Sequence, residues 1–398
     1  MAVFAIALLC AAWSSSTDTA RASTNFVKTS GTAFMLDGRP FYVTGVNNHY
    51  LTFGSRREVL SVLDDAVALG ANVVRTFLQP VIGSLDGSRA TIWAWRSSSD
   101  ASNLGVGGTY LLYWDHVAGA MAINDGPDGM AKVDFLLAES AKRNLKLIIA
   151  FLDFWDYTGG SQQMRAWYGS TDKAGFFFDD PRPKADYRRW VAHVVGRVNS
   201  LTGMTYRDDP TIMAWELMNE GNAVPETLRL AWSAEMSAYV KSLDPNHLVG
   251  SGHAGAIDRM SDLAVQSLDF GTWHGYPLYY KLSVRQFDRT ISEFCEVGAR
   301  AGKPVLLEEF GYARSNPDAA DAYALWLDTL SRGPDCAGWV VWRLVSRQDS
   351  GNYPTDLHDQ FDVRNDGSPI WEALRTAAAR KRSTASDDHP PSTTREAR

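Results

Sequence analysis

Residues 146–153 read Lys-Leu-Ile-Ile-Ala-Phe-Leu-Asp, a short apolar run that ends on a carboxylate. A second run, Val305-Leu306-Leu307, is also continuous in branched apolar residues. Strands covered on both faces show such runs, whereas a strand with one solvated face alternates apolar and polar residues. Both segments therefore predict buried strands of a parallel sheet.

Runs of this kind recur along the chain, and amphipathic helical patterns separate them. The strand candidates are Phe41–Asn48, Asn72–Phe77, Lys146–Asp153, Ile212–Glu220, His247–Gly252, Leu268–Tyr276, Pro304–Gly311 and Ala337–Leu344. The helix candidates are Arg56–Leu69, Asp128–Arg143, Asp186–Ser200, Glu226–Ser242, Val284–Ala301, Pro317–Leu330 and Pro369–Ala379. Alternating strands and helices predict a parallel α/β sheet. Eight strands in one domain favour a (β/α)8 TIM barrel over an open sheet.

Two segments do not fit this repeat. Residues 34–41, Phe-Met-Leu-Asp-Gly-Arg-Pro-Phe, predict a β-hairpin with an Asp-Gly turn. Because it precedes the first strand, we expect it to plug the barrel floor. Residues 81–125 form a long stretch rich in Gly, Ser and aromatic residues, which we interpret as a loop that shapes the site above the second strand.

The two ends of the chain predict processing and disorder. Residues 1–22 resemble a secretory signal peptide, since an apolar run is followed by a polar segment and by Ala20-Arg21-Ala22. No positive residue precedes Arg21, which departs from that pattern. We expect cleavage after Ala22 and a secreted or periplasmic protein with one domain at 23–380. Residues 381–398, rich in Ser, Thr, Pro and charge, predict a disordered tail.

After that cleavage two cysteines would remain, Cys295 and Cys336. Two are too few for a disulfide scaffold, and they lack the spacing of a zinc site. They could pair in an oxidising compartment, but two separate buried thiols are favoured.

The composition argues against several classes of partner. Apolar residues make up 45% and charged residues 21%, as in globular proteins. No apolar run approaches the roughly 18 residues needed to cross a bilayer. The net charge is −7 with no basic stripe, so a nucleic acid is not expected. Aromatic residues at 12% favour a neutral ligand that stacks on rings, although a large aromatic core explains them equally well. We expect a monomer.

Polar residues gather where the candidate strands end, and in such barrels those ends carry the chemistry. In strand order they are Asn47, Asn48, His49, Arg75, Asp153, Trp155, Asp156, Asn219, Glu220, His274, Tyr276, Glu308, Glu309 and Trp342. Carboxylates from the fourth and seventh strands of a closed ring can face each other across its mouth. Glycosidic cleavage uses such a pair, one protonating the leaving oxygen while the other attacks or activates water. No metal or cofactor is needed. The alternative to a catalytic pair is that Glu220, Glu308 and Glu309 only form structural ion pairs with Arg75 and other residues at the barrel rim.

From about residue 34 to residue 374 the chain resembles glycoside hydrolase family 5, and within it the endo-β-1,4-mannanases. Residues 202–220, which end Trp-Glu-Leu-Met-Asn-Glu, are similar to the mannanase fourth-strand signature. Residues 303–311 are similar to the nucleophile strand, and 155–160 and 342–349 are also mannanase-like. The resemblance implies retaining hydrolysis of β-1,4-mannosidic bonds in mannan, glucomannan or galactomannan, a neutral polysaccharide or oligosaccharide substrate.

By this resemblance Glu220 is the acid/base and Glu309 the nucleophile. An acid that holds its proton near neutral pH needs a raised pKa. The nucleophile must stay ionised, which Arg75 and the hydroxyl of Tyr276 can ensure.

The other expected contacts are with the substrate. Asn219 is placed to hydrogen-bond the sugar 2-hydroxyl. His274 is expected to orient or buffer the acid, and Trp342 to offer a flat wall to the sugar ring. Trp155 and Asp153 are further candidates for binding the substrate.

Glu308 is the rival nucleophile. Neighbours on a strand point to opposite faces, so we expect only one of Glu308 and Glu309 to enter the barrel. Glu308 would then point toward the helix layer or the rim. Glu216 is expected to pair with Arg75, because an unpaired charge there would be costly.

Some residues depart from the mannanase pattern. Asp153-Phe154 stand where two Asn are usual, Gly221 replaces a common Pro, and residues 357–361 differ from the usual segment after the eighth strand. The open alternatives are an exo-β-mannosidase or a β-1,4-glucanase on the same scaffold, a non-catalytic carbohydrate-binding protein, and an extracellular structural protein.

Overall fold

The computed structural model describes residues 26–93, 98–99, 104–105, 108–171, 175–222, 224–255, 260–354 and 360–387. Eight parallel strands form one sheet in the order β13-β12-β11-β5-β4-β16-β15-β14. Their bounds are β4 Val43–Asn47, β5 Val73–Phe77, β11 Lys146–Ala150, β12 Ile212–Glu216, β13 Leu248–Gly250, β14 Gly271–Gly275, β15 Val305–Phe310 and β16 Gly338–Val341. Each strand lies within its predicted range.

Backbone hydrogen bonds join the two ends of this strand order. The Asp269 amide donates to the Val249 carbonyl (2.8 Å), and the His274 amide donates to the Ala254 carbonyl (2.6 Å). The eight strands therefore form a closed ring, and the predicted (β/α)8 barrel is confirmed.

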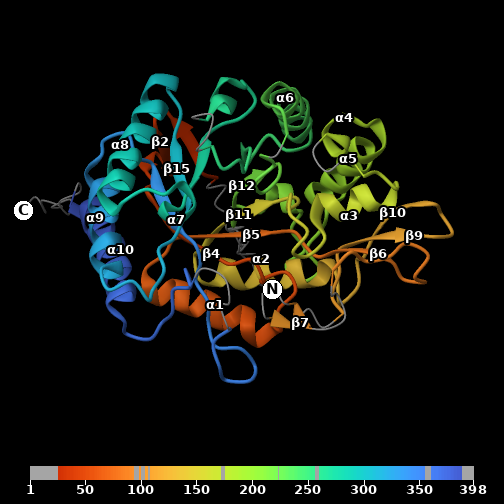
Figure 1. Ribbon diagram of the computed structural model, residues 1–398, viewed down its shortest axis with the longest axis horizontal. Helices are drawn as coiled ribbons and strands as arrows, with labels where there is room; N and C mark the ends of the chain where they lie inside the picture. The colour runs from red at the N-terminus through yellow and green to blue at the C-terminus, as the bar shows by residue number, and fades with distance from the viewer. Residues whose placement is uncertain are drawn as a thin grey trace, which may run out of the picture.

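Helices surround the barrel (Figure 1). They are α1 Arg56–Leu69, α2 Met130–Lys142, α5 Pro181–Gly196, α6 Glu226–Leu243, α8 Val284–Ala301, α9 Ala319–Arg332 and α10 Pro369–Asp387. All seven predicted helices are present. Sequence reasoning missed the short helices α3 Gly160–Trp167, α4 Phe176–Asp179 and α7 Pro277–Tyr280, and the 3-10 helices η1 Tyr206–Asp208 and η2 Ser261–Ala264. The bounds of α1 and α8 match prediction, since a serine capping box starts each helix and a left-handed Gly ends it.

The N-terminal hairpin covers the barrel floor, as predicted. Strands β1 Lys28–Ser30, β2 Ala33–Leu36 and β3 Arg39–Pro40 pair antiparallel. Asp37 and Gly38 both have positive φ (55° and 76°), which is the type I′ turn that their sequence favours. Phe34 is 1% exposed and packs edge-on against Phe270, in a cluster with residues such as Val43 from the N-terminal ends of the strands.

Part of the segment 81–125, which was predicted to be a loop, forms a small sheet. Strands β6 Val81–Ser84, β9 Leu112–Asp115 and β10 Ala120–Ile123 pair with one another, and the short strands β7 Ser98–Ser99 and β8 Leu104–Gly105 form a separate pair. The three-stranded sheet lies at the end of the molecule opposite α9 and α10 (Figure 1).

This sheet braces the segment that follows the third barrel strand. A Cβ on Gly159, whose φ is 97°, would lie 2.0 Å from the Val81 carbonyl oxygen, so only glycine permits the close approach. The Ser161 amide then donates to the Asp153 carbonyl (2.8 Å), which ties α3 to the end of the strand.

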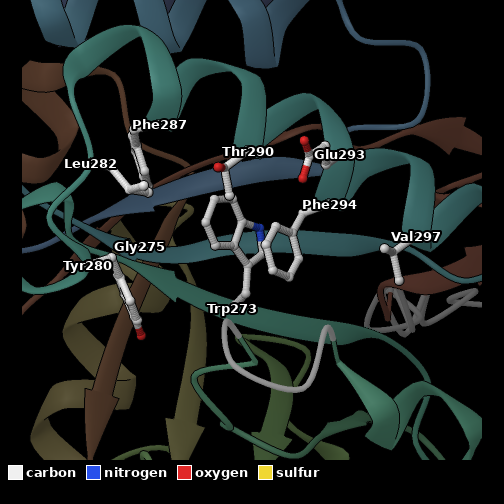
Figure 2. A pocket seen from close by; sticks show the side chains of 9 residues that line it. All are labelled: Trp273, Gly275, Tyr280, Leu282, Phe287, Thr290, Glu293, Phe294 and Val297. Carbon is white, nitrogen blue, oxygen red and sulfur yellow. The ribbon is translucent and has the colours of Figure 1, made fainter.

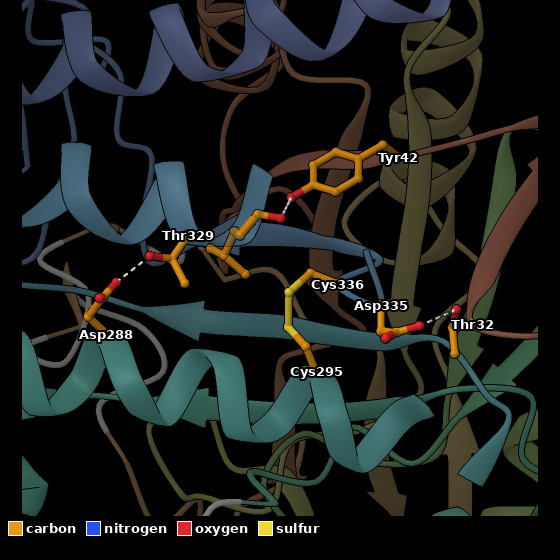
Figure 3. The surroundings of a disulfide bond; sticks show 8 residues. Thr32, Tyr42, Asp288, Cys295, Thr329, Asp335 and Cys336 are labelled. Carbon is orange, nitrogen blue, oxygen red and sulfur yellow. Dashed lines mark hydrogen bonds between the residues drawn. A yellow bond between two sulfur atoms is a disulfide. The ribbon is translucent and has the colours of Figure 1, made fainter. Parts of the chain in front are cut away.

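A disulfide links α8 to the start of β16 (Figure 3). Cys295 and Cys336 have Cα atoms 4.9 Å apart and are joined by an S–S bond of 1.98 Å. The expectation of two separate buried thiols was therefore wrong. Sequence spacing could not show that α8 packs beside the turn that leads into β16.

The predicted ends are only partly within the described chain. The signal peptide at 1–22 lies outside it, as do residues 388–398 of the predicted tail. Helix α10 continues to Asp387 and so overlaps the start of that tail. Among the described residues, no helix has the length and apolar character needed to cross a bilayer.

Candidate active site

A fully buried arginine organises the mouth of the barrel. Arg75 of β5 donates from Nη1 to Glu309 Oε1 (2.7 Å) and from Nη2 to Asn219 Oδ1 (2.9 Å). It also donates to Asn47 Oδ1 (3.1 Å) and to Glu216 Oε2 (2.9 Å), so the predicted pair with Glu216 is confirmed. Burial alone would lower the pKa of Arg75, but the surrounding glutamates raise it above its ordinary value. The guanidinium therefore stays charged.

Two carboxylates converge beside this arginine. Oxygens of Glu220, which follows β12, and of Glu309 in β15 lie within 4.8 Å of each other and of a His274 nitrogen. Tyr276 donates its hydroxyl to Glu309 Oε2 (2.6 Å). Retaining glycosidases place their carboxyl groups about 5–5.5 Å apart and inverting ones about 6.5–9.5 Å, so this spacing fits the retaining reaction. A metal ion could also use such a spacing, and the expectation that none is needed stays a prediction.

Glu220 has two hydrogen-bond donors. His274 Nδ1 lies 2.6 Å from its Oε1, and the Trp155 indole donates to its Oε2 (2.7 Å). The backbone of Glu220 is left-handed (φ 52°), which is uncommon for a residue with a Cβ and is often found at functional sites. Sequence reasoning placed Trp155 against the sugar and missed its bond to Glu220.

Asp153 lies behind Asn219. The Asn219 amide donates from Nδ2 to Asp153 Oδ1 (2.9 Å), while its Oδ1 accepts from Arg75. Asp153 is buried, and this burial raises the pKa of its carboxyl to about 7. The two residues thus fix each other's orientation, and the contact of either with a sugar stays a prediction.

Trp342 stands at the end of β16 within a group of rings. It stacks on His49 (ring centroids 6.0 Å apart) and on Phe77 (6.2 Å). Its backbone amide donates to the carbonyl of Phe310, the residue after Glu309. The aromatic wall predicted for the sugar therefore stands next to the proposed nucleophile.

A family model described as "GH family 5 beta-mannosidase-like" matches residues 126–332. A putative mannan endo-1,4-beta-mannosidase 9 from Oryza sativa subsp. japonica is 31% identical over 375 residues, which cover 82% of this chain and 83% of that protein. The chain belongs to glycoside hydrolase family 5.

Further relatives match this family 5 glycoside hydrolase over most of its length. Mannan endo-1,4-beta-mannosidase A from Podospora anserina is 28% identical and covers 83% of this chain and 85% of its own. The crystal structure of an endo-1,4-beta-mannanase from Rhizomucor miehei superposes with a TM-score of 0.75 and 29% identity, over 90% of this chain and 99% of that one.

The position of Glu308 in this family 5 chain corrects a prediction. Its carboxylate is fully buried inside the barrel, 3.5 Å from Arg75 Nε and 3.4 Å from His274 Nε2. The pairing of β14 with β15 shifts at this point, because Trp273 is opposite Leu307 and His274 is opposite Glu309. Glu308 is the extra residue of a β-bulge, which breaks the alternation of faces. Two successive carboxylates therefore point inward.

The alternation of faces holds on β14 itself. Figure 2 shows Trp273 projecting from β14 to α8, where it stacks on Phe294 with ring centroids 4.3 Å apart. The two rings line a cavity of about 310 Å³ on the outer side of the barrel. His274, the next residue, faces inward to the carboxylates.

In the free protein the pKa values of Glu220 and Glu309 shift in directions opposite to those expected. Burial would raise the pKa of Glu220, but the bonds from His274 and Trp155 lower it below its ordinary value. Burial raises the pKa of Glu309, and the adjacent cations do not fully offset it. Burial would lower the pKa of His274, but Glu309, Glu220 and Glu308 raise it to about 10. These directions favour a proton on His274, one hydrogen bond from Glu220.

Proposed function

We propose that this chain is an endo-β-1,4-mannanase that cleaves mannan, glucomannan or galactomannan with retention of configuration. The observation that carries the proposal is the pair of oxygens on Glu220 and Glu309, within 4.8 Å of each other. The names of the relatives, mannan endo-1,4-beta-mannosidases from rice and fungi, support the choice of substrate.

In the first step Glu309 attacks the anomeric carbon of the sugar. The glycosidic C–O bond breaks as the new ester bond forms, and Glu220 gives its proton to the leaving oxygen. Arg75 and Tyr276 hold the two oxygens of Glu309 at 2.7 and 2.6 Å, which fixes the carboxylate for attack.

In the second step water replaces Glu309. Glu220, now ionised, takes a proton from the water, whose oxygen attacks the anomeric carbon and releases Glu309 as a carboxylate. Two inversions at one carbon give retention.

We propose that His274 supplies the proton that Glu220 donates. The two groups are joined by a hydrogen bond of 2.6 Å, and the surrounding carboxylates raise the pKa of His274 to about 10, which favours a proton on the imidazole in the free protein. A leaving oxygen that gains negative charge draws the proton through Glu220, and the proton that Glu220 takes from water in the second step returns to His274. Asn219 would hold the sugar 2-hydroxyl, and Trp342 would face the sugar ring.

The location and partners of the protein are also proposals. A disulfide between Cys295 and Cys336 is typical of proteins in an oxidising compartment, which supports secretion or a periplasmic location. A neutral polysaccharide substrate fits the net charge of −7, and we expect the protein to act as a monomer.

The products formed from β-1,4-mannohexaose and from cellohexaose test this function. An endo-mannanase releases short mannooligosaccharides at early times and leaves cellohexaose intact. Mannose as the sole early product would indicate an exo-mannosidase, and faster cleavage of cellohexaose would indicate a glucanase. Glu309→Gln is the matched control. If it releases as many reducing ends from galactomannan as the wild type, the mechanism is rejected.

A further inference from the structure

Two buried carboxyl groups take no part in the steps above. Glu216 of β12 and Glu308 of β15 are fully buried. Each places an oxygen beside Arg75 Nε, at 2.9 Å from Glu216 Oε2 and 3.5 Å from Glu308 Oε2. Among the described residues, the second oxygen of each carboxyl, Oε1, has no donor from another side chain or the backbone. The two carboxyls do interact with each other.

Two ionised carboxylates in contact would repel each other in this dry interior. A single guanidinium nitrogen cannot offset the loss of hydration of both. If one carboxyl keeps its proton, the repulsion disappears and the O–H becomes the donor that the partner's oxygen lacks. The shared Arg75 Nε therefore favours one proton for the two groups.

His274 decides which carboxyl carries that proton. Its Nδ1 lies 2.6 Å from Glu220 Oε1, and its Nε2 lies 3.4 Å from Glu308 Oε2. Both ring nitrogens face carboxylate oxygens, an arrangement that an imidazolium satisfies because both of its nitrogens are donors. Glu308 thus contacts two cations, Arg75 and His274, whereas Glu216 contacts Arg75 alone. The negative charge is more stable on Glu308.

We propose that Glu216 and Glu308 share one proton held on Glu216, and that ionised Glu308 is a positioning residue that keeps His274 cationic beside Glu220. The pKa directions agree with this geometry. Burial raises the pKa of Glu216 well above its ordinary value, whereas Arg75, Glu216 and His274 outweigh burial and lower the pKa of Glu308 to about 2.

The β-bulge in β15 places Glu308 beside His274. Without the extra residue, Glu308 would face the helix layer and His274 Nε2 would lose its carboxylate partner. Other charged or titratable groups around the pair also act on His274. From the neighbouring strands and strand ends these are Glu220 and Glu309, which raise the pKa of His274, and His253, whose charge interacts with that of His274.

Nitrogen-15 NMR of the histidine side chains tests the proposal without any assay of activity. We expect His274 in the wild-type protein to carry protons on both nitrogens at pH 8. In Glu308→Gln it should lose one of them at a lower pH, since the negative charge moves to Glu216. A neutral His274 ring in the wild type at pH 8, or identical titrations in the two proteins, would overturn the proposal.

Infrared difference spectra test the shared proton directly. The wild type at pH 9 should show the carbonyl band of a neutral carboxylic acid that is missing in Glu216→Gln. An unchanged band would place the proton elsewhere and contradict the proposal. This measurement and the wild-type NMR remain decisive if Glu308→Gln does not fold.

The kinetic test compares the wild type with single variants. It measures the alkaline limb of the pH profile of kcat/KM on mannohexaose. Glu308→Gln should move this limb to lower pH, with at least about tenfold more loss at pH 8 than at pH 5. Glu216→Gln should move it less, because the Gln amide still donates to Glu308. Asp134→Asn is a control that removes a buried carboxylate from α2, where Asp134 pairs with Arg197, and it should not move the limb.

The kinetic part of this inference rests on the proposed function, and the spectroscopic part does not. A doubly protonated His274 in a protein inactive on every mannan would reject the function and support the shared proton. If the wild type is active and Glu216→Gln and Glu308→Gln move the alkaline limb of the pH profile equally, the function is supported and the inference is overturned.

Discussion

Single side chains set the charge of this site through short contacts. Arg75 uses its donors on Glu309, Asn219, Asn47 and Glu216, so one buried cation fixes groups from several strands. Glu220, in contrast, is held by a histidine and an indole. Each of these contacts is open to test by removing one donor.

Trp155→Phe removes the indole donor from Glu220 and keeps an aromatic ring. The bond from Trp155 favours ionised Glu220, so its loss should raise the pKa of Glu220 and move the alkaline limb of kcat/KM to higher pH. At the optimum the rate should fall by about tenfold or less, the value of one hydrogen bond. The pH profile on mannohexaose measures both effects.

Trp93→Phe is the matched control, because the Trp93 indole donates to the Val81 carbonyl rather than to Glu220. Its profile should match the wild type. A limb that stays in place, or moves to lower pH, in Trp155→Phe would refute this role of the indole.

Asp153→Asn should change how stability depends on pH. The folded pKa of Asp153 is about 7 against an ordinary value of 3.8, so between these values the folded protein holds a proton that the unfolded chain has lost. Stability therefore falls as pH rises through this window, by as much as about 4 kcal/mol. Urea unfolding at pH 4 and pH 8 should show a larger fall in the wild type than in Asp153→Asn, since the raised pKa values of Glu216 and Glu309 make both proteins less stable as the pH rises. Parallel curves for the two proteins would exclude the shifted carboxyl, and the exposed Asp156→Asn serves as control.

At this scale the sequence identified Arg75, Glu216, Glu220 and Glu309, because strand ends in a barrel meet at one mouth. It did not identify Trp155 as a donor, since a residue after the third strand has no fixed direction until its loop folds. It also misplaced Glu308, because nothing in Glu308-Glu309 reveals an extra residue in the strand.

Among helices and strands, too, features set by local sequence were predictable and features set by distant contacts were not. Helices α1 and α8 were predictable to the residue, because their capping residues are local. Part of residues 81–125 was misread, since pairing of β6 with β9 depends on contacts distant in sequence. The N-terminal hairpin was predictable from its Asp-Gly turn. Its packing against the barrel floor can be tested by mutation.

Phe34→Ala should destabilise the protein without altering the site. The ring is 1% exposed against Phe270, so its loss leaves a cavity that costs about 3–5 kcal/mol in the free energy of unfolding. KM on mannan should not change, because the hairpin is at the opposite end of the barrel. Arg39→Ala, an exposed change in the same hairpin, should shift stability by no more than about 0.5 kcal/mol. An equal effect of both changes would show that Phe34 does not seal the floor.

On the scale of the whole molecule, the closed barrel and one disulfide hold the strand ends in place. The barrel was predictable from eight repeated strand–helix units. The disulfide was not, because its two cysteines come together only when α8 packs beside β16.

Replacing Cys295 and Cys336 together by Ala should lower the free energy of unfolding by about 2–4 kcal/mol, since the bond closes a loop between residues 41 apart. Thermal unfolding measures this loss. The wild type in reductant should approach the double variant, and a variant as stable as the oxidised wild type would contradict a structural role for the bond.

Trapping of the glycosyl-enzyme tests the central claim most directly. A 2-deoxy-2-fluoro-mannoside with a good leaving group should label the protein once, and mass spectrometry of the peptide spanning residues 304–312 should locate the sugar ester on Glu309. A label on Glu308 or Glu220, or turnover with no covalent adduct and an inverted first product, would contradict the account.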